Sequence, residues 1–183
     1  MTEVEQDRAD MRRLQGGDQT ALDPLMQRWQ IRLRAYLLRH GVSDADACDL
    51  AQDTFVRVFR HAERFDPRRI FSTWMFQIAI NLRRDLMRRD RRRESQPLTT
   101  VPESSTAEDP ANRTEIAEQA TAVRRAIESL PQNLQEVLIL VVYEQLPHSE
   151  VATIIGATPK AVESRLYRAR EKLRQSLSGY LAR

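Results

Sequence analysis

The sequence predicts an all-α protein built from two small helical domains that are joined by a flexible linker. Apolar residues recur at three- and four-residue spacing along most of the chain, and no stretch sustains the alternation of a half-buried strand. Only 5 glycines and 8 prolines occur among 183 residues, while 41% of the residues are hydrophobic, which suffices for packed cores. A change of composition at residues 94–112 separates the expected domains 1–93 and 113–183.

Two amphipathic helices are expected between Asp18 and Ala62. Asp18 follows a Gly-Gly pair and suits the N-cap of a helix that ends near Gly41. Ser43, followed three residues later by Asp46, resembles a capping box and starts the second helix. The side of the second helix that we expect to be buried consists of Ala47, Leu50, Ala51, Phe55, Val58, Phe59 and Ala62.

The exposed side of this second helix is acidic over its first half. Compensation of the helix dipole accounts for Asp44 and Asp46, because carboxylates are favoured in a first turn. Asp49 and Asp53 lie further along and four residues apart, where like charges repel each other. A basic protein partner would account for this second pair.

The stretch from Asp66 to Arg93 predicts a loop and then a helix that combines aromatic and basic residues. The residue before Pro67 is disfavoured in a helix, so 66–70 is expected to be the loop. The helix is expected to bury Phe71, Met75, Ile78, Leu82 and Leu86, to present Gln77, Asn81, Arg84 and Arg88 on the other side, and to carry Trp74 on the flank. Seven arginines against two aspartates give residues 83–93 a charge of +5, which suits a polyanion whose bases are also contacted. A solvated helix end is the alternative.

The segment 94–112 is rich in Pro, Ser and Thr and has little to bury, which predicts a linker. Residues 94–118 carry six acidic residues against one arginine, a charge of −5. A passive tether and a segment whose negative charge has a function are both open. The segregated signs indicate different partners for different parts of the chain.

The C-terminal part predicts two helices followed by a helix-turn-helix. The first two are expected to bury Ala117, Ala120, Val123, Ile127 and Leu130, and then Leu134, Val137, Leu138, Val141 and Val142. A short helix at 148–155, a turn at Gly156-Ala157 and a longer helix from Pro159 have helix-turn-helix spacing, with Thr158 as the N-cap. A plain helical hairpin is the alternative, but the cap, proline, glycine and basic face agree with a helix that reads DNA.

Other classes of protein find little support in the sequence. Cys48 is the single cysteine, so an internal disulfide and a multi-cysteine zinc site are excluded. His40, His61 and His148 are isolated, and no phosphate loop or nucleophile motif occurs, so we expect no enzyme, metal or cofactor. The charged N-terminus and the lack of 18 consecutive apolar residues predict a soluble, cytoplasmic protein without membrane insertion.

Three stretches resemble the extracytoplasmic-function (ECF) sigma factors of the bacterial sigma-70 family. DADACDLAQDTFVRVFRHAERFD is similar to the sigma region 2 helix that docks on RNA polymerase, and FSTWMFQIAINLRRDLMRRDRR to the helix that melts and reads the promoter −10 element. SLPQNLQEVLILVVYEQLPHSEVATIIGATPKAVESRLYRAREKLRQSL is similar to region 4, which reads the −35 element. The resemblance implies a non-catalytic promoter-specificity subunit that binds core RNA polymerase at the clamp coiled coil and the flap, binds promoter DNA, and has an anti-sigma partner.

The resemblance also implies a role for individual residues. Core polymerase would be bound by Asp49, Gln52, Asp53, Phe55 and Phe59. The −10 element would be contacted by Asp66, Arg68, Arg69, Phe71, Trp74, Asn81, Arg84 and Arg88, with the loop and Phe71 forming a pocket for a flipped base. The −35 duplex would be contacted by Lys160, Glu163, Ser164, Arg165, Tyr167 and Arg168. The acidic linker would imitate RNA in the polymerase channels.

Two features limit what the resemblance transfers. Glu163 stands where many family members carry Lys or Arg, and a carboxylate accepts a hydrogen bond from cytosine rather than donating one to guanine. The −35 sequence is therefore not transferable, and the variable loop around Ile70 leaves the flipped base undecided. The alternative function is a stand-alone helix-turn-helix transcription regulator, which would bind symmetric operators without polymerase.

Overall fold

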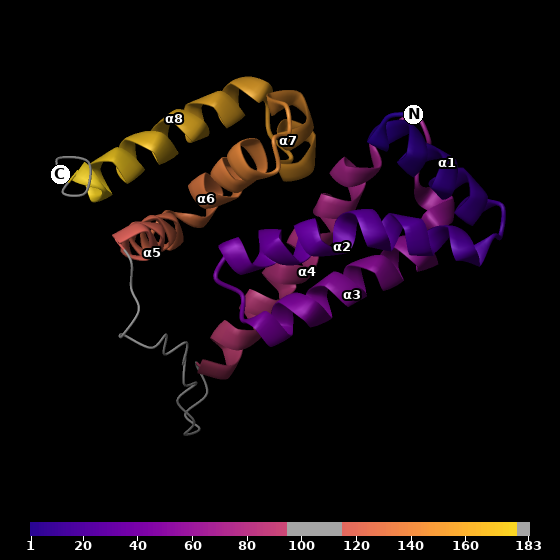
Figure 1. Ribbon diagram of the computed structural model, residues 1–183, viewed down its shortest axis with the longest axis horizontal. Helices are drawn as coiled ribbons and strands as arrows, with labels where there is room; N and C mark the ends of the chain where they lie inside the picture. The colour runs from indigo at the N-terminus through magenta and orange to yellow at the C-terminus, as the bar shows by residue number, and fades with distance from the viewer. Residues whose placement is uncertain (95–114, 179–183) are drawn as a thin grey trace.

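A computed structural model describes residues 1–94 and 115–178, which form two helical units packed against each other (Figure 1). The N-terminal unit comprises α1 (Glu3–Gln15), η1 (Gln19–Ala21), α2 (Leu22–Arg39), α3 (Asp44–Arg60), η2 (Ala62–Arg64) and α4 (Phe71–Glu94). The C-terminal unit comprises α5 (Glu115–Glu128), α6 (Gln132–Leu138), η4 (Ile139–Tyr143), α7 (His148–Ile155) and α8 (Pro159–Ser176). The described residues contain no strand, and the prediction of an all-α fold is confirmed. The predicted linker lies almost wholly outside the described residues.

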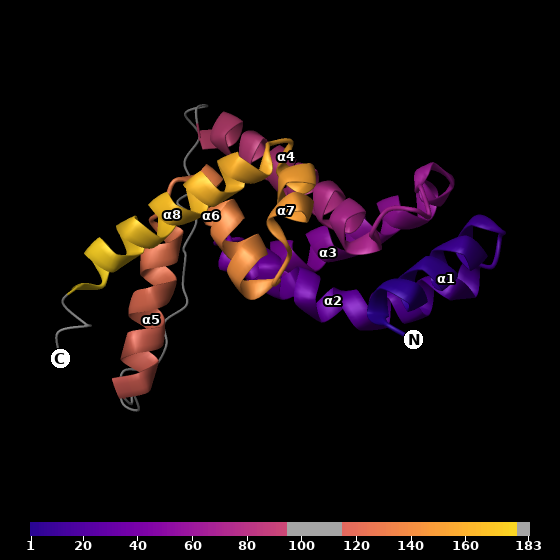
Figure 2. The same cartoon turned by 90° about the horizontal axis from the view of Figure 1, so that it is seen from above.

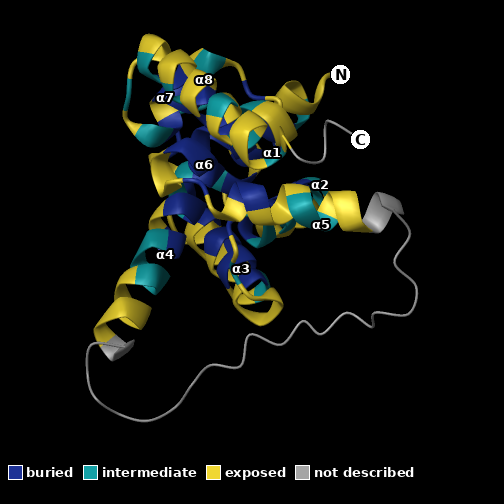
Figure 3. Ribbon diagram, turned by 90° about the vertical axis from the view of Figure 1, so that its left-hand side faces the viewer, coloured by how far each residue is buried: buried dark blue, intermediate teal, exposed yellow. Residues whose placement is uncertain are grey.

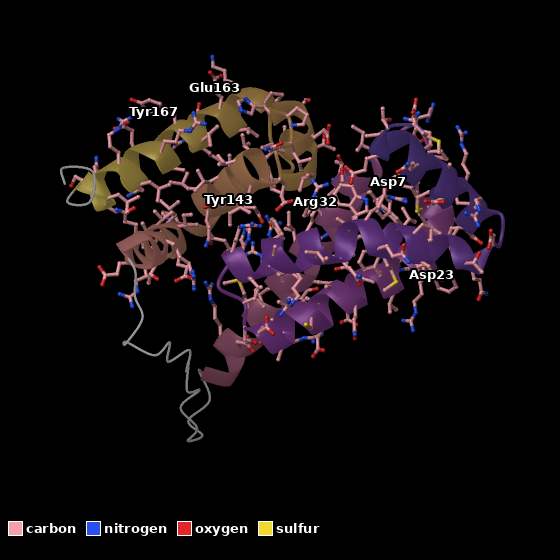
Figure 4. All side chains as sticks on the ribbon, viewed as in Figure 1. Asp7, Asp23, Arg32, Tyr143, Glu163 and Tyr167 are labelled. Atoms are coloured by element: carbon pink, nitrogen blue, oxygen red, sulfur yellow. The ribbon has the colours of Figure 1, made fainter. Side chains whose placement is uncertain are left out.

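The apolar pattern did not predict α1, which is held by polar contacts as well as by its buried Met11 and Leu14. Thr2 and Glu5 form a capping box at its start. Its buried Asp7 accepts hydrogen bonds from Trp29 Nε1 at 3.0 Å and from Arg28 Nε at 2.9 Å. Burial raises the pKa of Asp7, although these hydrogen bonds lower it. Figure 4 shows Asp7 on the inner side of α1, and this contact attaches α1 to α2.

The N-terminal core lies where α2, α3 and α4 meet. Trp29 of α2 packs against Phe71 and Phe76 of α4, with ring centroids 6.3 and 6.4 Å apart. The predicted caps Ser43 and Thr158 each accept a hydrogen bond from a backbone N–H in the first turn, of α3 and α8 respectively. Asp18 caps η1, the short turn that leads into α2.

The buried side of α4 is wider than the sequence predicts. Phe76 and Ile80 are buried, whereas Ile78 and Leu86 are only half-buried. The reason is that α4 packs against α3 on one side and against α7 of the other unit on another. Figure 2 shows α7 lying against α4.

The C-terminal unit differs from the prediction in the part that precedes the helix-turn-helix. Ala120 is exposed and Val123 is 38% exposed, because only the second half of α5 packs on its neighbours. The π-helical turn η4 follows α6 and changes the register of the later side chains. As a result Val142, expected in the core, is 44% exposed, and Glu144 is buried instead.

The two units share one continuous hydrophobic core. Figure 3 shows α6 as a largely buried helix between α7 and α8 on one side and the N-terminal unit on the other. Leu134, Val137 and Leu138 of α6 are all buried. The sequence did not predict this arrangement of the units. Among the described residues, no helix has both the length and the apolar character needed to cross a membrane.

Candidate nucleic-acid and polymerase interface

The acidic face of α3 divides into two pairs. Asp44 is paired with Arg34, and Asp46 donates its backbone N–H to the capping Ser43 Oγ at 3.1 Å. Asp49 and Asp53 are exposed, and neither forms an ion pair with any of the described residues. The fold therefore uses the first pair and leaves the second pair, with Gln52 beside it, available to a partner.

Apolar side chains lie next to these free carboxylates. Phe55 is only 2% exposed and supports the surface from below, whereas Phe59 is 40% exposed. The expectation that Phe59 is buried is wrong, because the outer side of α3 has no covering helix at that point. Ile31 and Val56 are 75% and 43% exposed. A hollow of about 220 Å³ is lined by Met26, Gln30, Ile31, Arg34, Cys48, Ala51, Gln52 and Phe55.

Sequence reasoning missed Ile31 and Val56 as members of this surface. The signal for Ile31 is that it is apolar but out of phase with the buried stripe of α2, which runs through Leu25, Trp29 and Leu33. An acidic rim around exposed aliphatic and aromatic side chains suits a helical, basic protein partner.

The loop before α4 is ordered by its own charges. Asp66 accepts hydrogen bonds from the backbone N–H and the guanidinium of Arg68 at 3.0 and 2.9 Å. These hydrogen bonds lower the pKa of Asp66 to about 2, so its carboxylate is ionised. The side chain of Arg68 is nevertheless 90% exposed, and Arg69 is also exposed. The loop thus presents two cations to solvent.

Phe71 requires a correction. Its side chain is 1% exposed and packs against Trp29 and Phe65, so it is a core residue beneath the loop and not a surface contact for a base. Trp74 is half-buried, with its ring centroid 5.2 Å from that of Phe65. Trp74 therefore keeps part of its ring at the surface beside the loop, as its flanking position predicted.

The polar side of α4 is partly occupied by the other unit. Asn81 and Arg88 are exposed, and Arg88 pairs with Asp85 in the same helix. Arg84 donates to Glu136 of α6 at 2.9 Å, so one predicted DNA contact is engaged within the protein. A hollow of about 340 Å³ is lined by Asn81, Arg84, Met87, Arg88, Arg91 and Gln132. Gln132 of the C-terminal unit therefore forms one side of this basic hollow.

The helix-turn-helix has the geometry that the sequence predicts. Gly156 ends α7 in the left-handed conformation at φ 66°, Thr158 caps α8, and Pro159 occupies its first turn. Val162, Leu166 and Ala169 of α8 face inward and are buried. The predicted readers Lys160, Glu163, Ser164, Tyr167 and Arg168 are exposed, and Arg165 is half-buried.

The outward face of α8 is exposed in the part of the chain that the structure describes. Tyr167 is 67% exposed, and Figure 4 shows Glu163 and Tyr167 pointing away from both units. Arg168 Nε donates to the carbonyl oxygen of Ser164 at 3.3 Å, which orients the guanidinium along the helix. Most of the side chains that are predicted to contact the −35 duplex are therefore accessible among the described residues.

Each of the two units matches a known protein family. The model described as Sigma-70 region 2 matches residues 25–93, and the model described as Sigma-70, region 4 matches residues 120–173. The ECF RNA polymerase sigma factor RpoE of Cereibacter sphaeroides is 32% identical over 162 residues, which cover 88% of each chain. This chain belongs to the ECF sigma factors. The stand-alone regulator is therefore not the function that the family supports.

Two solved structures share the arrangement of the helices. The structure of CnrH in complex with the cytosolic domain of CnrY matches with a TM-score of 0.75 at 28% identity, over 95% of this chain and 98% of that chain. The sigma factor RpoE of Bartonella quintana, in complex with the anti-sigma factor NepR, has the same fold, with a TM-score of 0.70 at 21% identity over 85% and 96% of the two chains. As a sigma factor, the protein acts in transcription initiation by RNA polymerase.

Proposed function

We propose that the three exposed surfaces of this sigma factor bind core polymerase, the −10 element and the −35 element respectively. The segment 1–93 binds core polymerase and the −10 element, 94–112 is the acidic linker, and 113–183 reads the −35 element. The protein has no catalytic activity of its own and acts in the cytoplasm. Because DNA is read in two places by one chain, polymerase positions both readers at once.

The polymerase surface consists of Asp49, Gln52, Asp53 and Phe59, supported from below by Phe55 and extended by Ile31 and Val56. Its free carboxylates suit the basic residues of a clamp coiled coil, and its apolar side chains suit the stem of a helix. The flap binds the C-terminal unit. An anti-sigma factor, of the kind seen with the Bartonella protein, competes for these surfaces.

The −10 reader consists of the loop 66–70 together with Trp74, Asn81, Arg84 and Arg88. The exposed guanidinium groups of Arg68, Arg69 and Arg88 bind phosphates, and Trp74 offers a ring edge to an unstacked base. Unpairing a base costs a few kcal/mol, which stacking and enclosure by polymerase offset. Phe71 holds the loop in place from the core.

The −35 reader is the outward face of α8. Five predicted base and phosphate contacts on it are exposed, and its first turn carries a side-chain cap and a proline that fix the helix start. The observation that carries the proposal is the exposed outward face of α8, whose start is fixed by the N-cap Thr158. Glu163, near the start of the helix, selects cytosine through its N4 amino group.

In-vitro transcription with core polymerase and a randomised promoter library tests the proposal directly. We expect transcripts from a subset of promoters that share one −35 and one −10 sequence at fixed spacing. Core polymerase alone is the control and should show no such selection. Transcription that does not depend on the promoter sequence, or sequence-specific nanomolar binding of duplex DNA by the protein without polymerase, would contradict it.

A further inference from the structure

A buried glutamate of the C-terminal unit binds Arg84 of the proposed −10 reader and its neighbour Arg83, which is buried in the same helix. Glu136 Oε1 accepts a hydrogen bond from Arg83 Nη2 at 3.1 Å, and its Oε2 accepts one from Arg84 Nη2 at 2.9 Å. Glu136 is 4% exposed and Arg83 is 1% exposed. A carboxylate that spans two adjacent guanidinium groups offers them the same acceptors as the phosphate of a DNA strand.

A second buried glutamate repeats this arrangement on α2. Glu144 lies between Arg32 and Arg39, with nitrogen–oxygen distances of 3.6 and 3.4 Å. Arg39 also lies over the ring of Tyr143, 4.5 Å from its centroid. Figure 4 shows Arg32 and Tyr143 where α2 faces the C-terminal unit. Glutamates from α6 and from the turn after η4 thus hold arginines from two helices of the other unit.

The start of α4 is covered by α7. Gln77 Nε2 donates to the carbonyl oxygen of Thr153 at 2.8 Å, and Thr73 Oγ1 donates to Glu150 Oε2 at 3.1 Å. A hollow at the rim of this contact is lined by Arg68, Arg69, Ile70, Thr73, Ser149, Glu150 and Thr153. The loop cations therefore face an acidic side chain of the other unit.

The packed arrangement conflicts with capture of a DNA strand by α4. Arg84 is bound to Glu136, and Gln132 of α6 stands beside Asn81 in the basic hollow. A strand that follows α4 from the loop 66–70 toward Arg88 meets α7 first and α6 next. The −10 reader cannot be fully used while the two units are packed.

Three unpaired polar atoms lie buried near the contact between the units. Arg83 Nε, His40 Nε2 and the hydroxyl of Tyr36 are buried without a hydrogen-bond partner in the described part of the chain. A buried polar atom without a partner costs stability in the packed state. Buried ion pairs and unpaired polar atoms thus lie beside the shared hydrophobic core at this contact.

We propose that the packing of the C-terminal unit on α4 is an autoinhibitory contact in which Glu136 occupies Arg83 and Arg84 in place of the −10 strand. The inference rests on the proposed function of α4 as the −10 reader. Binding to core polymerase separates the units, and the released arginines then bind the strand. The free protein accordingly binds single-stranded promoter DNA weakly because the ligand site is filled by its own carboxylate.

Two variants test the contact at different points. Glu136→Gln removes the charge that neutralises Arg83 and leaves the size of the side chain unchanged. Glu150→Lys places a cation next to Arg68 and Arg69 and so disfavours the packed state by repulsion. Glu128 is exposed on α5, so Glu128→Gln and Glu128→Lys are controls with the same change of charge.

The measurements are the radius of gyration by small-angle X-ray scattering and the affinity for a fluorescent single-stranded oligonucleotide with the −10 sequence selected in the transcription experiment. We expect both variants to expand and to bind the oligonucleotide at least tenfold more tightly than their controls. On core polymerase, wild type and variants should bind it within about twofold of one another, because polymerase has already separated the units.

The outcomes separate this inference from the function on which it rests. If the wild-type protein supports promoter-specific transcription but both variants match their controls in size and affinity, the autoinhibitory contact is refuted and the function stands. If the wild type supports no such transcription, the proposed function itself fails. If Glu136→Gln loses its helical circular dichroism, the Glu150→Lys variant still tests the autoinhibitory contact. Glu150 is half-exposed at the rim of the contact, so its replacement should leave the fold intact.

Discussion

Acidification should destabilise this protein through His40. The ring of His40 is 7% exposed and lies on Tyr36, with ring centroids 4.4 Å apart. Its Nδ1 is 3.0 Å from the carbonyl oxygen of Tyr36, which can only accept a hydrogen bond, so Nδ1 carries the proton of the neutral ring. Nε2 is buried and has no partner among the described residues, so it is the atom that would take up a second proton.

The magnitude follows from the pKa of His40. Burial, and next the charge of Arg83, lower it from 6.5 to about 3. The unfolded chain therefore takes up a proton below about pH 6.5 and the folded protein does not, so stability falls as the pH drops below that value. Between pH 7.5 and pH 5 this single group should cost about 2 kcal/mol of unfolding free energy.

Urea unfolding followed by circular dichroism at the two pH values measures this loss. His40→Asn retains a donor near the position of Nδ1 but does not titrate, so its stability should fall by about 2 kcal/mol less than that of the wild type. The exposed His61 provides the control variant His61→Asn, which should keep the wild-type dependence. Equal losses in wild type and His40→Asn would show that His40 is not held neutral by burial.

Three further changes test the surfaces and the turn. Replacing both Asp49 and Asp53 by Arg should weaken association with core polymerase at least tenfold in a pull-down titration and leave the helical circular dichroism intact; retained association would remove α3 from the polymerase contact. Glu163→Arg should change the preferred −35 base, with discrimination of about 1–3 kcal/mol in a promoter library, and an unchanged preference would show that this residue reads no base. Gly156 has φ 66°, and a Cβ at this position would meet no other atom within 4 Å. Gly156→Ala should therefore cost about 1–2 kcal/mol from the backbone conformation alone, and an unchanged thermal midpoint would contradict that.

Apart from α1, the main helices were predictable because their signals are local. Ser43 and Thr158 are N-caps in the structure as in the sequence, and the left-handed Gly156 stands where the helix-turn-helix needs its turn. Each of these signals depends on residues within one or two turns of the helix it starts or ends. Such signals therefore do not depend on how the rest of the chain packs.

The burial of Arg83 was not predictable from local signals of this kind. In the sequence it is the first of seven arginines in a basic run that suits a polyanion, whereas in the structure it is among the largest fully buried side chains. Its burial requires the carboxylate of Glu136, which is 53 residues away. A pattern within one helix cannot show that a second unit will cover the charged side as well as the apolar side.

The register of η4 illustrates a second limit. A period of 3.6 residues predicts Val142 inside, but the wider π-helical turn brings Glu144 inside and leaves Val142 at the surface. Phe59 is a third case, since an apolar residue on the flank of a helical stripe is buried only if a neighbour covers it. Phe59 belongs to the candidate polymerase interface, and functional sites are where local rules are most often broken.

The attachment of α1 has a practical consequence for shortened versions of the protein. The region 2 family match begins at residue 25, which invites removal of everything before it. Such a cut would leave Trp29 Nε1 and Arg28 without the carboxylate of Asp7, and would remove the hydrogen bonds from Gln15 to the carbonyl oxygens of Ala62 and Phe65. It would also open the apolar contact made by the buried Met11. Recombinant versions should therefore retain the first helix, even though it carries none of the residues assigned to DNA or polymerase.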